Sequence, residues 1–393
     1  MQKLIYSLII FIPLTFIAEY LMHNPTLAFI SSCLGIIPMA KLMGDATEVL
    51  AHKVGGAFAG VLNSGLGNLA EMIIAVMALL KGEIEVLKAS LTGSIIANIL
   101  LVFGMSAFFG GLKREDQSFN KAAASASSSL LFIVIVALLI PSFMGSLSPK
   151  METITHNSSM SLISAGLLLL MFAGSLIFSL KTHSHIYEEA KVEGQPEEEA
   201  HDGSTAKAVT MLIVTSSVIA LLAEALTGTI GHASESLGLS RVFIGVVVVA
   251  IVGNAAEHSV AIMFAMKNKM NLAMNIALES SKQIATFITP MLVILGLILG
   301  KPFDLVFSPL EVIALFACVT VLNFVCQDGR SNWLEGLSML ALYGILGTAF
   351  FFFSPPEAGH SEEVPITGHQ DMGMMPLTPS GHPAGTAHPA GQH

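Results

Sequence analysis

Long apolar runs constrain the fold of this chain more than any other feature. A run of about 20 apolar residues spans a bilayer as a helix, and the sequence contains eleven such runs. They lie at Leu4–Met22, Thr26–Met43, Phe58–Leu80, Lys88–Gly110, Ala122–Phe143, Ser158–Leu180, Lys207–Ile230, Val242–Met266, Leu272–Leu299, Leu310–Cys326 and Trp333–Phe353. Only 12% of the 393 residues are charged, against about 25% in soluble domains. The sequence therefore predicts an all-α polytopic membrane protein with about 11 transmembrane helices in a lipid bilayer.

The lysines and arginines between the runs predict the orientation. Eleven of them flank the side that holds the N-terminus and five flank the other side. Because cytoplasmic loops carry the excess of positive charge, we expect a bacterial inner-membrane protein with its N-terminus in the cytoplasm and its C-terminus outside. The formal net charge of −10 does not indicate a nucleic-acid partner, because the acids gather in one loop and in the tail.

An internal repeat organises these runs. A shift of 186 residues, without a gap, brings together identical residues of two segments. It places Gly67, Asn68, Ala70, Glu71, Ala75, Met77, Lys81 and Ser94 on Gly253, Asn254, Ala256, Glu257, Ala261, Met263, Lys267 and Ser280. Five runs separate the two copies, and this odd number inverts the second copy in the membrane. Inverted repeats with glycine-interrupted helices at matching positions are typical of secondary transporters, whose site lies near the bilayer midplane.

The repeat divides the chain into five parts. We expect an extra N-terminal helix at 1–25, a first five-helix repeat at 26–181, an acidic cytoplasmic linker at 182–206, a second, inverted five-helix repeat at 207–354 and a tail at 355–393. The acidic linker fits a solvated connection as well as a cation-sensing or docking element. The tail is rich in His, Gly and Pro, and its irregular spacing favours disorder over a metal site.

Two acids at bilayer depth, Glu71 and Glu257, predict the functional site, because burying a carboxylate there is costly. Neutral oxygens accompany them from Asn68, Asn254, Ser94, Ser280 and Gln283. An all-oxygen set suits a hard cation such as Ca²⁺ better than zinc or copper. The glycine before each Asn is expected to loosen its helix and free backbone carbonyls for the cation. The structural alternative is an interhelical hydrogen bond between protonated acids.

The same acids provide a basis for proton coupling. Two buried carboxylates near one another disfavour joint ionisation. Protonated they are neutral, and ionised they neutralise a divalent cation, so that Ca²⁺ and protons compete for one site. The two titrations would be coupled and belong to the pair. Glu48 and Glu224, in the runs before each motif, form a weaker pair that suits either proton relay or interfacial anchoring.

The two motifs resemble the alpha-repeats of the cation/proton exchanger (CAX) family, within the calcium/cation antiporter superfamily. The likeness extends from about Ile36 to Phe353. It is carried by Gly67-Asn68-Leu-Ala-Glu71, Gly253-Asn254-Ala-Ala-Glu257-His258, Ala46-Thr47-Glu48, Gly93-Ser94-Ile-Ile-Ala-Asn98, Ser280-Ser281-Lys-Gln283-Ile-Ala and Ser331-Asn-Trp-Leu-Glu-Gly336. The resemblance implies an eleven-helix fold that exports Ca²⁺ in exchange for H⁺, with the Glu of each repeat as central ligand. Ca²⁺ is then a transported substrate, and no cofactor is expected.

Glu279 and Lys282 depart from that family, which usually has glycine and an apolar residue there. One interpretation is an ion pair three residues apart on a helix. The other is that Lys282 projects a fixed positive charge towards the site and changes which ion binds or how many protons return. Further candidate modulators are Asn98, Ser281 and His258. His258 fits a packing role better than titration near neutrality.

Other functions fit the sequence less well. A sodium-coupled or monovalent-cation antiporter of the same superfamily is the main alternative. A passive channel is disfavoured, because two carboxylates in an inverted repeat indicate an occluding site. An intramembrane hydrolase needs a nucleophile with a base, or zinc ligands such as His-Glu-x-x-His. Neither arrangement occurs at matched depth in the sequence. We therefore do not expect an enzyme.

Overall fold

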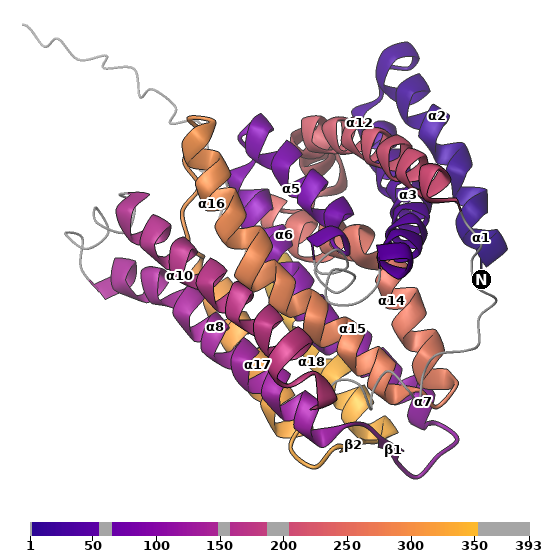
Figure 1. Ribbon diagram of the computed structural model, residues 1–393. Coiled ribbons are helices and arrows are strands. Elements are labelled where there is room, and N and C mark those ends of the chain that lie inside the picture. The colour runs from indigo at the N-terminus through magenta and orange to yellow at the C-terminus, as the bar shows by residue number, and fades with distance from the viewer. Residues whose placement is uncertain (1, 55–64, 148–157, 187–203, 353–393) are drawn as a thin grey trace, which may run out of the picture. The chain divides into compact units, whose positions relative to one another are not determined.

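The computed structural model describes residues 2–54, 65–147, 158–186 and 204–352, and helices dominate this part of the chain (Figure 1). The first half contains α1 (Gln2–Ser7), η1 (Leu8–Ile10), α2 (Phe11–Phe16), η2 (Ile17–Leu21), α3 (Pro25–Val54), α5 (Leu69–Lys81), α6 (Ile84–Ile96), η3 (Ala97–Phe103), α7 (Gly104–Gly111), α8 (Lys121–Leu147), α10 (Ser158–Ile177) and η4 (Phe178–Thr182). The second contains α12 (Thr205–Leu237), α13 (Arg241–Phe243), η5 (Ile244–Val249), α14 (Ala250–Met266), α15 (Met270–Gln283), η6 (Ile284–Ile288), α16 (Thr289–Ile298), α17 (Pro309–Val325) and α18 (Trp333–Phe352). Segment η1 is a 3-10 turn, and η2 to η6 are π-helical.

The apolar runs are confirmed as helices. Among the described residues, eight helices are long and apolar enough to cross a membrane, and two shorter apolar helices cover Ile5–Leu21 and Pro309–Val325. Helix α5 occupies the end of the remaining run, whose residues 58–64 lie outside the described part. Residues 187–203 of the predicted linker (182–206) and the tail at 355–393 also lie outside it.

The main correction to the predicted runs concerns helix length. Helix α3 continues past the predicted end at Met43 as far as Val54, and Lys41 and Asp45 form an ion pair one turn apart where the polar stretch begins. Helix α12 similarly continues past Ile230 as far as Leu237, where Gly238 ends it in a left-handed conformation.

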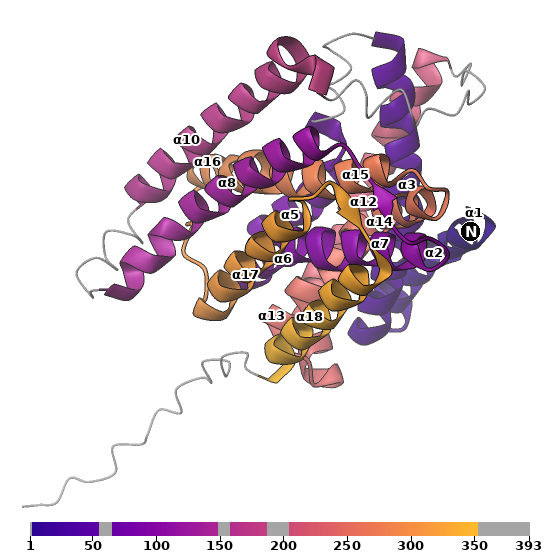
Figure 2. The same cartoon turned by 90° about the horizontal axis from the view of Figure 1, so that it is seen from below.

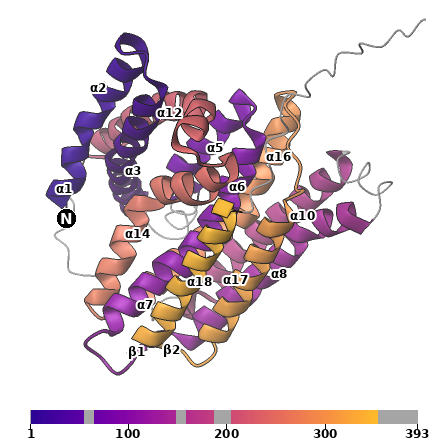
Figure 3. The ribbon, with the colours of Figure 1, turned by 180° about the vertical axis from the view of Figure 1, so that it is seen from behind.

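Two apolar clusters organise the packing. The smaller cluster joins α3 and α12 with parts of α5, η5 and α14, and the larger one includes α6, η3, α8, α15 and α17. Helix α12 lies along α3, with α2 beside it, while α8, α10 and α16 gather in another part of the bundle (Figure 1). The view from below shows α6 running through the middle of the helices (Figure 2), and its residues are almost all buried. From behind, α18 is seen lying along α7 (Figure 3).

Two glycines allow α6 and η5 to touch along their backbones. A Cβ atom added at Gly93 would lie 2.2 Å from the carbonyl oxygen of Val246. A Cβ atom added at Gly245 would lie 2.6 Å from the Cβ of Ala89. Because real Cβ atoms do not approach other heavy atoms so closely, both positions require glycine at this crossing. The contact joins the first repeat to the second beside the candidate site residue Ser94.

A short strand pair connects two loops from different repeats. Strand β1 (Gln117–Ser118) pairs antiparallel with β2 (Arg330–Ser331), with Gln117 opposite Ser331. The connection between α7 and α8 is thereby joined to the connection between α17 and α18. The two repeats are thus linked by loop backbone as well as by helix packing.

Candidate functional site

The two Gly-Asn-x-Ala-Glu motifs adopt different backbones. Gly67 and Asn68 form a turn, and Asn68 precedes α5 as its N-cap, which leaves Glu71 in the first turn of that helix. Gly253 and Asn254 instead lie inside the continuous helix α14. The prediction that glycine interrupts both helices is therefore wrong for the second motif. A helical glycine costs only about 1 kcal/mol relative to alanine, and the packing of α14 outweighs that cost.

Glu71 and Asn254 meet across the two repeats. The Nδ2 of Asn254 donates to Glu71 Oε1 at 3.2 Å, to Ser94 Oγ at 3.1 Å and to the carbonyl oxygen of Ala250 at 3.0 Å. Both Glu71 and Asn254 are buried. A second-repeat amide thus holds a first-repeat carboxyl group and a first-repeat hydroxyl in one cluster.

A reciprocal cluster lies around Ser280 and Asn68. The hydroxyl of Ser280 donates to Asn68 Oδ1 at 3.3 Å, and Asn68 Nδ2 lies 3.4 Å from the Ser280 carbonyl oxygen. Asn98 Nδ2 donates to Ser280 Oγ at 3.0 Å. The 186-residue shift relates the pair Asn68–Ser280 to the pair Asn254–Ser94. The amide of each motif therefore contacts the serine of the other repeat.

Each of the two glutamates has a buried oxygen without a hydrogen-bond partner among the described residues. These atoms are Glu71 Oε2 and Glu257 Oε2. The two carboxyl groups lie close enough to repel each other, and the Ser280 side chain is a hydrogen-bonding neighbour of Glu257. Buried carboxylate oxygens are costly when left unsatisfied. A cation or a proton would satisfy both, and the arrangement therefore fits either occupant.

The donor set around these glutamates fits a hard cation. Within the described part of the chain, no three His, Cys, Asp or Glu side chains gather into a metal-binding cluster. A cation between Glu71 and Glu257 would therefore be bound by two carboxylates together with neutral amide, hydroxyl or carbonyl oxygens. Ca²⁺ accepts such a set of ligands, and soft metals do not prefer it. His258 is buried beside the site, and its Nε2 contacts Asn98 Oδ1 at 3.2 Å. His258 therefore acts here as a hydrogen-bonding partner of Asn98.

Three of the sequence candidates, Glu48, Glu224 and Ser281, do not join this cluster. Glu224 pairs with Lys81 at 2.9 Å and is half exposed, and Glu48 is exposed on α3. The structure does not bring this pair together with Glu71 and Glu257. Ser281 is buried and donates to the carbonyl oxygen of Ala277 in its own helix. Gln283 is buried at the end of α15.

Glu279 and Lys282 form an ion pair at 2.6 Å. The Lys282 side chain is 7% exposed and that of Glu279 40% exposed. Ser127 on α8 lies 3.4 Å from both charged groups. The ammonium group is thus directed towards Glu279 and α8. Ser127 was missed from the sequence, because it lies in a run of Ala and Ser without a distinctive pattern.

Comparison with known proteins places this arrangement in a family. Residues 24–181 and 207–352 match the model of the sodium/calcium exchanger protein family. The Ca(2+)/H(+) antiporter of Synechocystis is 41% identical, covering 89% of this chain and 98% of that protein. The Ca(2+)/H(+) antiporter of Aphanothece halophytica is 38% identical, covering 91% of this chain and 99% of that protein. The solved structure of native YfkE has a TM-score of 0.75 at 35% identity and covers 88% of this chain and 99% of that one. This all-helical, multi-pass membrane protein therefore belongs to the Ca²⁺/H⁺ antiporter (CAX) family within the sodium/calcium exchanger superfamily.

Proposed function

We propose that the protein exchanges Ca²⁺ for H⁺ by alternating access, with Glu71 and Glu257 as the shared binding groups for both ions. The observation that carries this site assignment is the pair of buried oxygens, Glu71 Oε2 and Glu257 Oε2, that lack a hydrogen-bond partner within the described residues. Asn68, Asn254, Ser94, Ser280 and Gln283 are the proposed neutral ligands or their supports. Family membership supports the reaction, and the geometry supports the site.

The exchange follows from electrostatics. With Ca²⁺ bound, both carboxylates are ionised and their repulsion is cancelled by the divalent charge. When Ca²⁺ leaves, the repulsion between two buried acids favours proton uptake. Because the protonated pair carries no charge, it returns across the low-dielectric interior at much lower cost than two carboxylates. Occupation by one ion thus excludes the other, which couples the two fluxes.

Topology and direction complete the proposal. We place the N-terminus in the cytoplasm and the C-terminus outside a bacterial inner membrane, so that Ca²⁺ leaves the cytoplasm. The halves at 26–181 and 207–354 are proposed as the inverted repeats, with 1–25 as an extra helix. The reciprocal contacts Asn254–Ser94 and Asn68–Ser280 support this division, because the 186-residue shift relates one to the other.

The test is ⁴⁵Ca uptake into inverted membrane vesicles, driven by a proton gradient of acidic interior. The wild-type protein should take up Ca²⁺, and Glu257→Gln and Glu71→Gln should each abolish uptake, because a neutral amide cannot exchange a proton. Glu235→Gln is the matched control, because Glu235 is exposed near the end of α12. It should transport like the wild type.

Two outcomes contradict parts of the proposal. Unchanged uptake by Glu257→Gln would remove Glu257 from the site while leaving the family reaction intact. Uptake that follows an imposed sodium gradient, and does not respond to the proton gradient, would replace H⁺ with Na⁺ as the coupling ion.

A further inference from the structure

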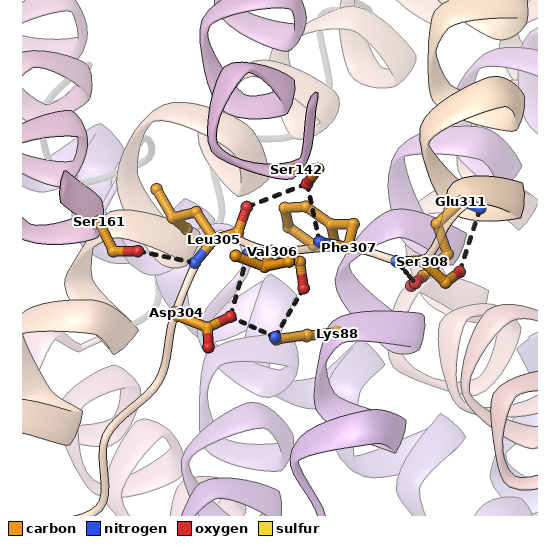
Figure 4. A network of polar contacts seen from close by, with 9 residues as sticks. All are labelled: Lys88, Ser142, Ser161, Asp304, Leu305, Val306, Phe307, Ser308 and Glu311. Atoms are coloured by element: carbon orange, nitrogen blue, oxygen red, sulfur yellow. Dashed lines mark hydrogen bonds and ion pairs between the residues drawn. The ribbon is translucent and has the colours of Figure 1, made fainter. Parts of the chain in front are cut away.

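A polar cluster connects α6 to the chain between α16 and α17 (Figure 4). The Nζ of Lys88 on α6 forms an ion pair with Asp304 and donates to the carbonyl oxygen of Val306 at 2.7 Å. Both charged side chains are largely buried, and Nζ lies 6.0 Å from the centre of the Phe303 ring. The ammonium group is therefore held by a carboxylate, a carbonyl and an aromatic face together.

One turn further along α6, Thr92 makes a second contact. Its hydroxyl oxygen lies 3.0 Å from Glu311 Oε1 and 3.1 Å from the carbonyl oxygens of Lys88 and Ala89 in its own helix, and both Thr92 and Glu311 are buried. Oε2 of Glu311 accepts from the Ser308 backbone N–H at 2.9 Å, within a capping box at the start of α17. Because both carboxylate oxygens are engaged, Glu311 is fixed with respect to its own helix.

The connection that carries Asp304 is itself fixed to two other helices. The backbone N–H of Leu305 donates to Ser161 Oγ on α10 at 3.1 Å. The N–H of Phe307 donates to Ser142 Oγ on α8 at 2.8 Å, and Ser142 donates in turn to the Leu305 carbonyl oxygen at 3.2 Å. Figure 4 shows Ser142 above the segment, Ser161 to its left and Lys88 below it. The segment is therefore a firm support for α6.

The helix held in this way carries two site residues. Ser94 follows Thr92 by two positions, and Asn98 follows in the π-helical continuation η3. Contacts at Lys88 and Thr92, four residues apart, fix both the rotation of α6 and its position along its axis. We propose that Lys88 and Thr92, together with Asp304 and Glu311, are positioning residues for the transport site. We call these four residues the α6 anchor.

The α6 anchor belongs to one repeat alone among the described residues. The 186-residue shift places Met274 at the position of Lys88 and Leu278 at that of Thr92, and both are buried in α15. Helix α15 is therefore set by apolar packing at these two positions, whereas α6 is set by directional polar contacts. Since the Asn254 amide bridges Ser94 and Glu71, a small displacement of α6 would act on the Ca²⁺ site through that bridge.

The experiment builds on the proposed function and measures the Ca²⁺ KM and Vmax of proton-driven uptake. Lys88→Met and Thr92→Val should each raise the KM roughly tenfold, because the ligands are displaced and not removed. Vmax should stay within about twofold. Lys88→Arg keeps donors for both acceptors and should restore the wild-type KM. Thr348→Val is the matched control, because the exposed Thr348 donates to the Gly344 carbonyl oxygen of its own helix α18.

A double-variant cycle separates positioning from a general loss of structure. If the α6 anchor acts through Ser94, Lys88→Met combined with Ser94→Ala should raise the KM no further than Ser94→Ala alone. Multiplying effects, or a Lys88→Met KM equal to that of Thr348→Val, would overturn the inference. Should Lys88→Met fail to fold, Lys88→Met with Asp304→Asn leaves no unpaired charge and serves in its place.

The two proposals fail in different ways. Absence of proton-driven uptake by the wild type, or unchanged uptake by Glu257→Gln, counts against the proposed function or its site. A different pattern counts against the α6 anchor alone. In that pattern the wild type transports normally and Ser94→Ala raises the KM, but Lys88→Met leaves the KM unchanged. The Ca²⁺-dependent rise in unfolding temperature of the purified proteins gives a second measure of binding that does not require coupling to protons.

Discussion

The two repeats place the same five-residue motif in different settings. Glu71 lies in the first turn of α5, where the helix N-terminus stabilises negative charge. Glu257 lies two turns inside α14, where the backbone amides are already bonded within the helix. The two acids of the proposed site therefore occupy unequal electrostatic positions. The two repeats thus supply the same chemical group, and the backbone around each group determines its electrostatic environment.

A second inequality lies one helix later. Gly93 in the first repeat allows α6 to touch the backbone of η5. The equivalent position in the second repeat holds Glu279, whose side chain turns towards Lys282 and Ser127. One half therefore has a tight backbone crossing at this position, and the other half has a charged pair.

The largest expected effect comes from adding a side chain at Gly93, where the second half also has a residue with a side chain. Gly93→Ala places a Cβ atom 2.2 Å from the Val246 carbonyl oxygen, so that α6 and η5 must separate. Such overpacking costs about 1–3 kcal/mol or more. We expect a marked fall in the unfolding temperature of the purified protein and loss of transport. Wild-type stability would show that the crossing does not depend on glycine.

The Glu279–Lys282 pair should respond unequally to loss of either partner. Glu279→Gln leaves a buried ammonium group without its counter-charge and should destabilise by about 2 kcal/mol. Lys282→Met leaves a carboxylate that is 40% exposed and should cost less than about 1 kcal/mol. The double change Glu279→Gly with Lys282→Met removes both charges and should recover most of the loss. Thermal unfolding in detergent measures all three, and equal costs for the single changes would contradict the burial difference.

The two amides of the site should differ in their effect on Ca²⁺ affinity. Asn254 donates to the Glu71 carboxyl group, a contact worth about 1.5–3 kcal/mol when charged, whereas Asn68 lies 3.4 Å from a neutral backbone carbonyl. Asn254→Ala should therefore raise the Ca²⁺ KM roughly tenfold or more, and Asn68→Ala by less. The kinetics of ⁴⁵Ca uptake decide, and a reversed order would indicate that Asn68 coordinates the ion directly.

The smallest effect is expected at Gly253. A Cβ atom there would meet Ile74 Cδ1 at 3.7 Å, an ordinary contact, and the residue is helical. Gly253→Ala should leave uptake unchanged and stabilise the protein by up to about 1 kcal/mol. Loss of uptake with unchanged folding would show that α14 must open at Gly253 during the transport cycle. Circular dichroism on heating and vesicle uptake together separate the two results.

The sequence predicts some levels of this structure better than others. The helices follow from apolar length, and the repeat singles out Asn68, Asn254, Ser94 and Ser280 as candidate site residues, although it does not predict which of them pair. The intact helix at Gly253 does not follow, because the same motif can form a turn or a helix and tertiary packing determines which conformation it adopts. The contacts of Ser127 and of the α6 anchor were missed for a related reason. Serine, threonine and lysine acquire such roles only from partners more than a hundred residues away.

The packing between the repeats has a consequence for how the chain is held together. Helix α12 lies along α3, α6 crosses η5, and the loop that carries Asp304 supports α6, so each half completes the interior of the other. Both apolar clusters draw residues from both halves. Interlocking helices and contacts between the halves therefore hold the described part of the chain together, much as an interface holds the subunits of an obligate dimer.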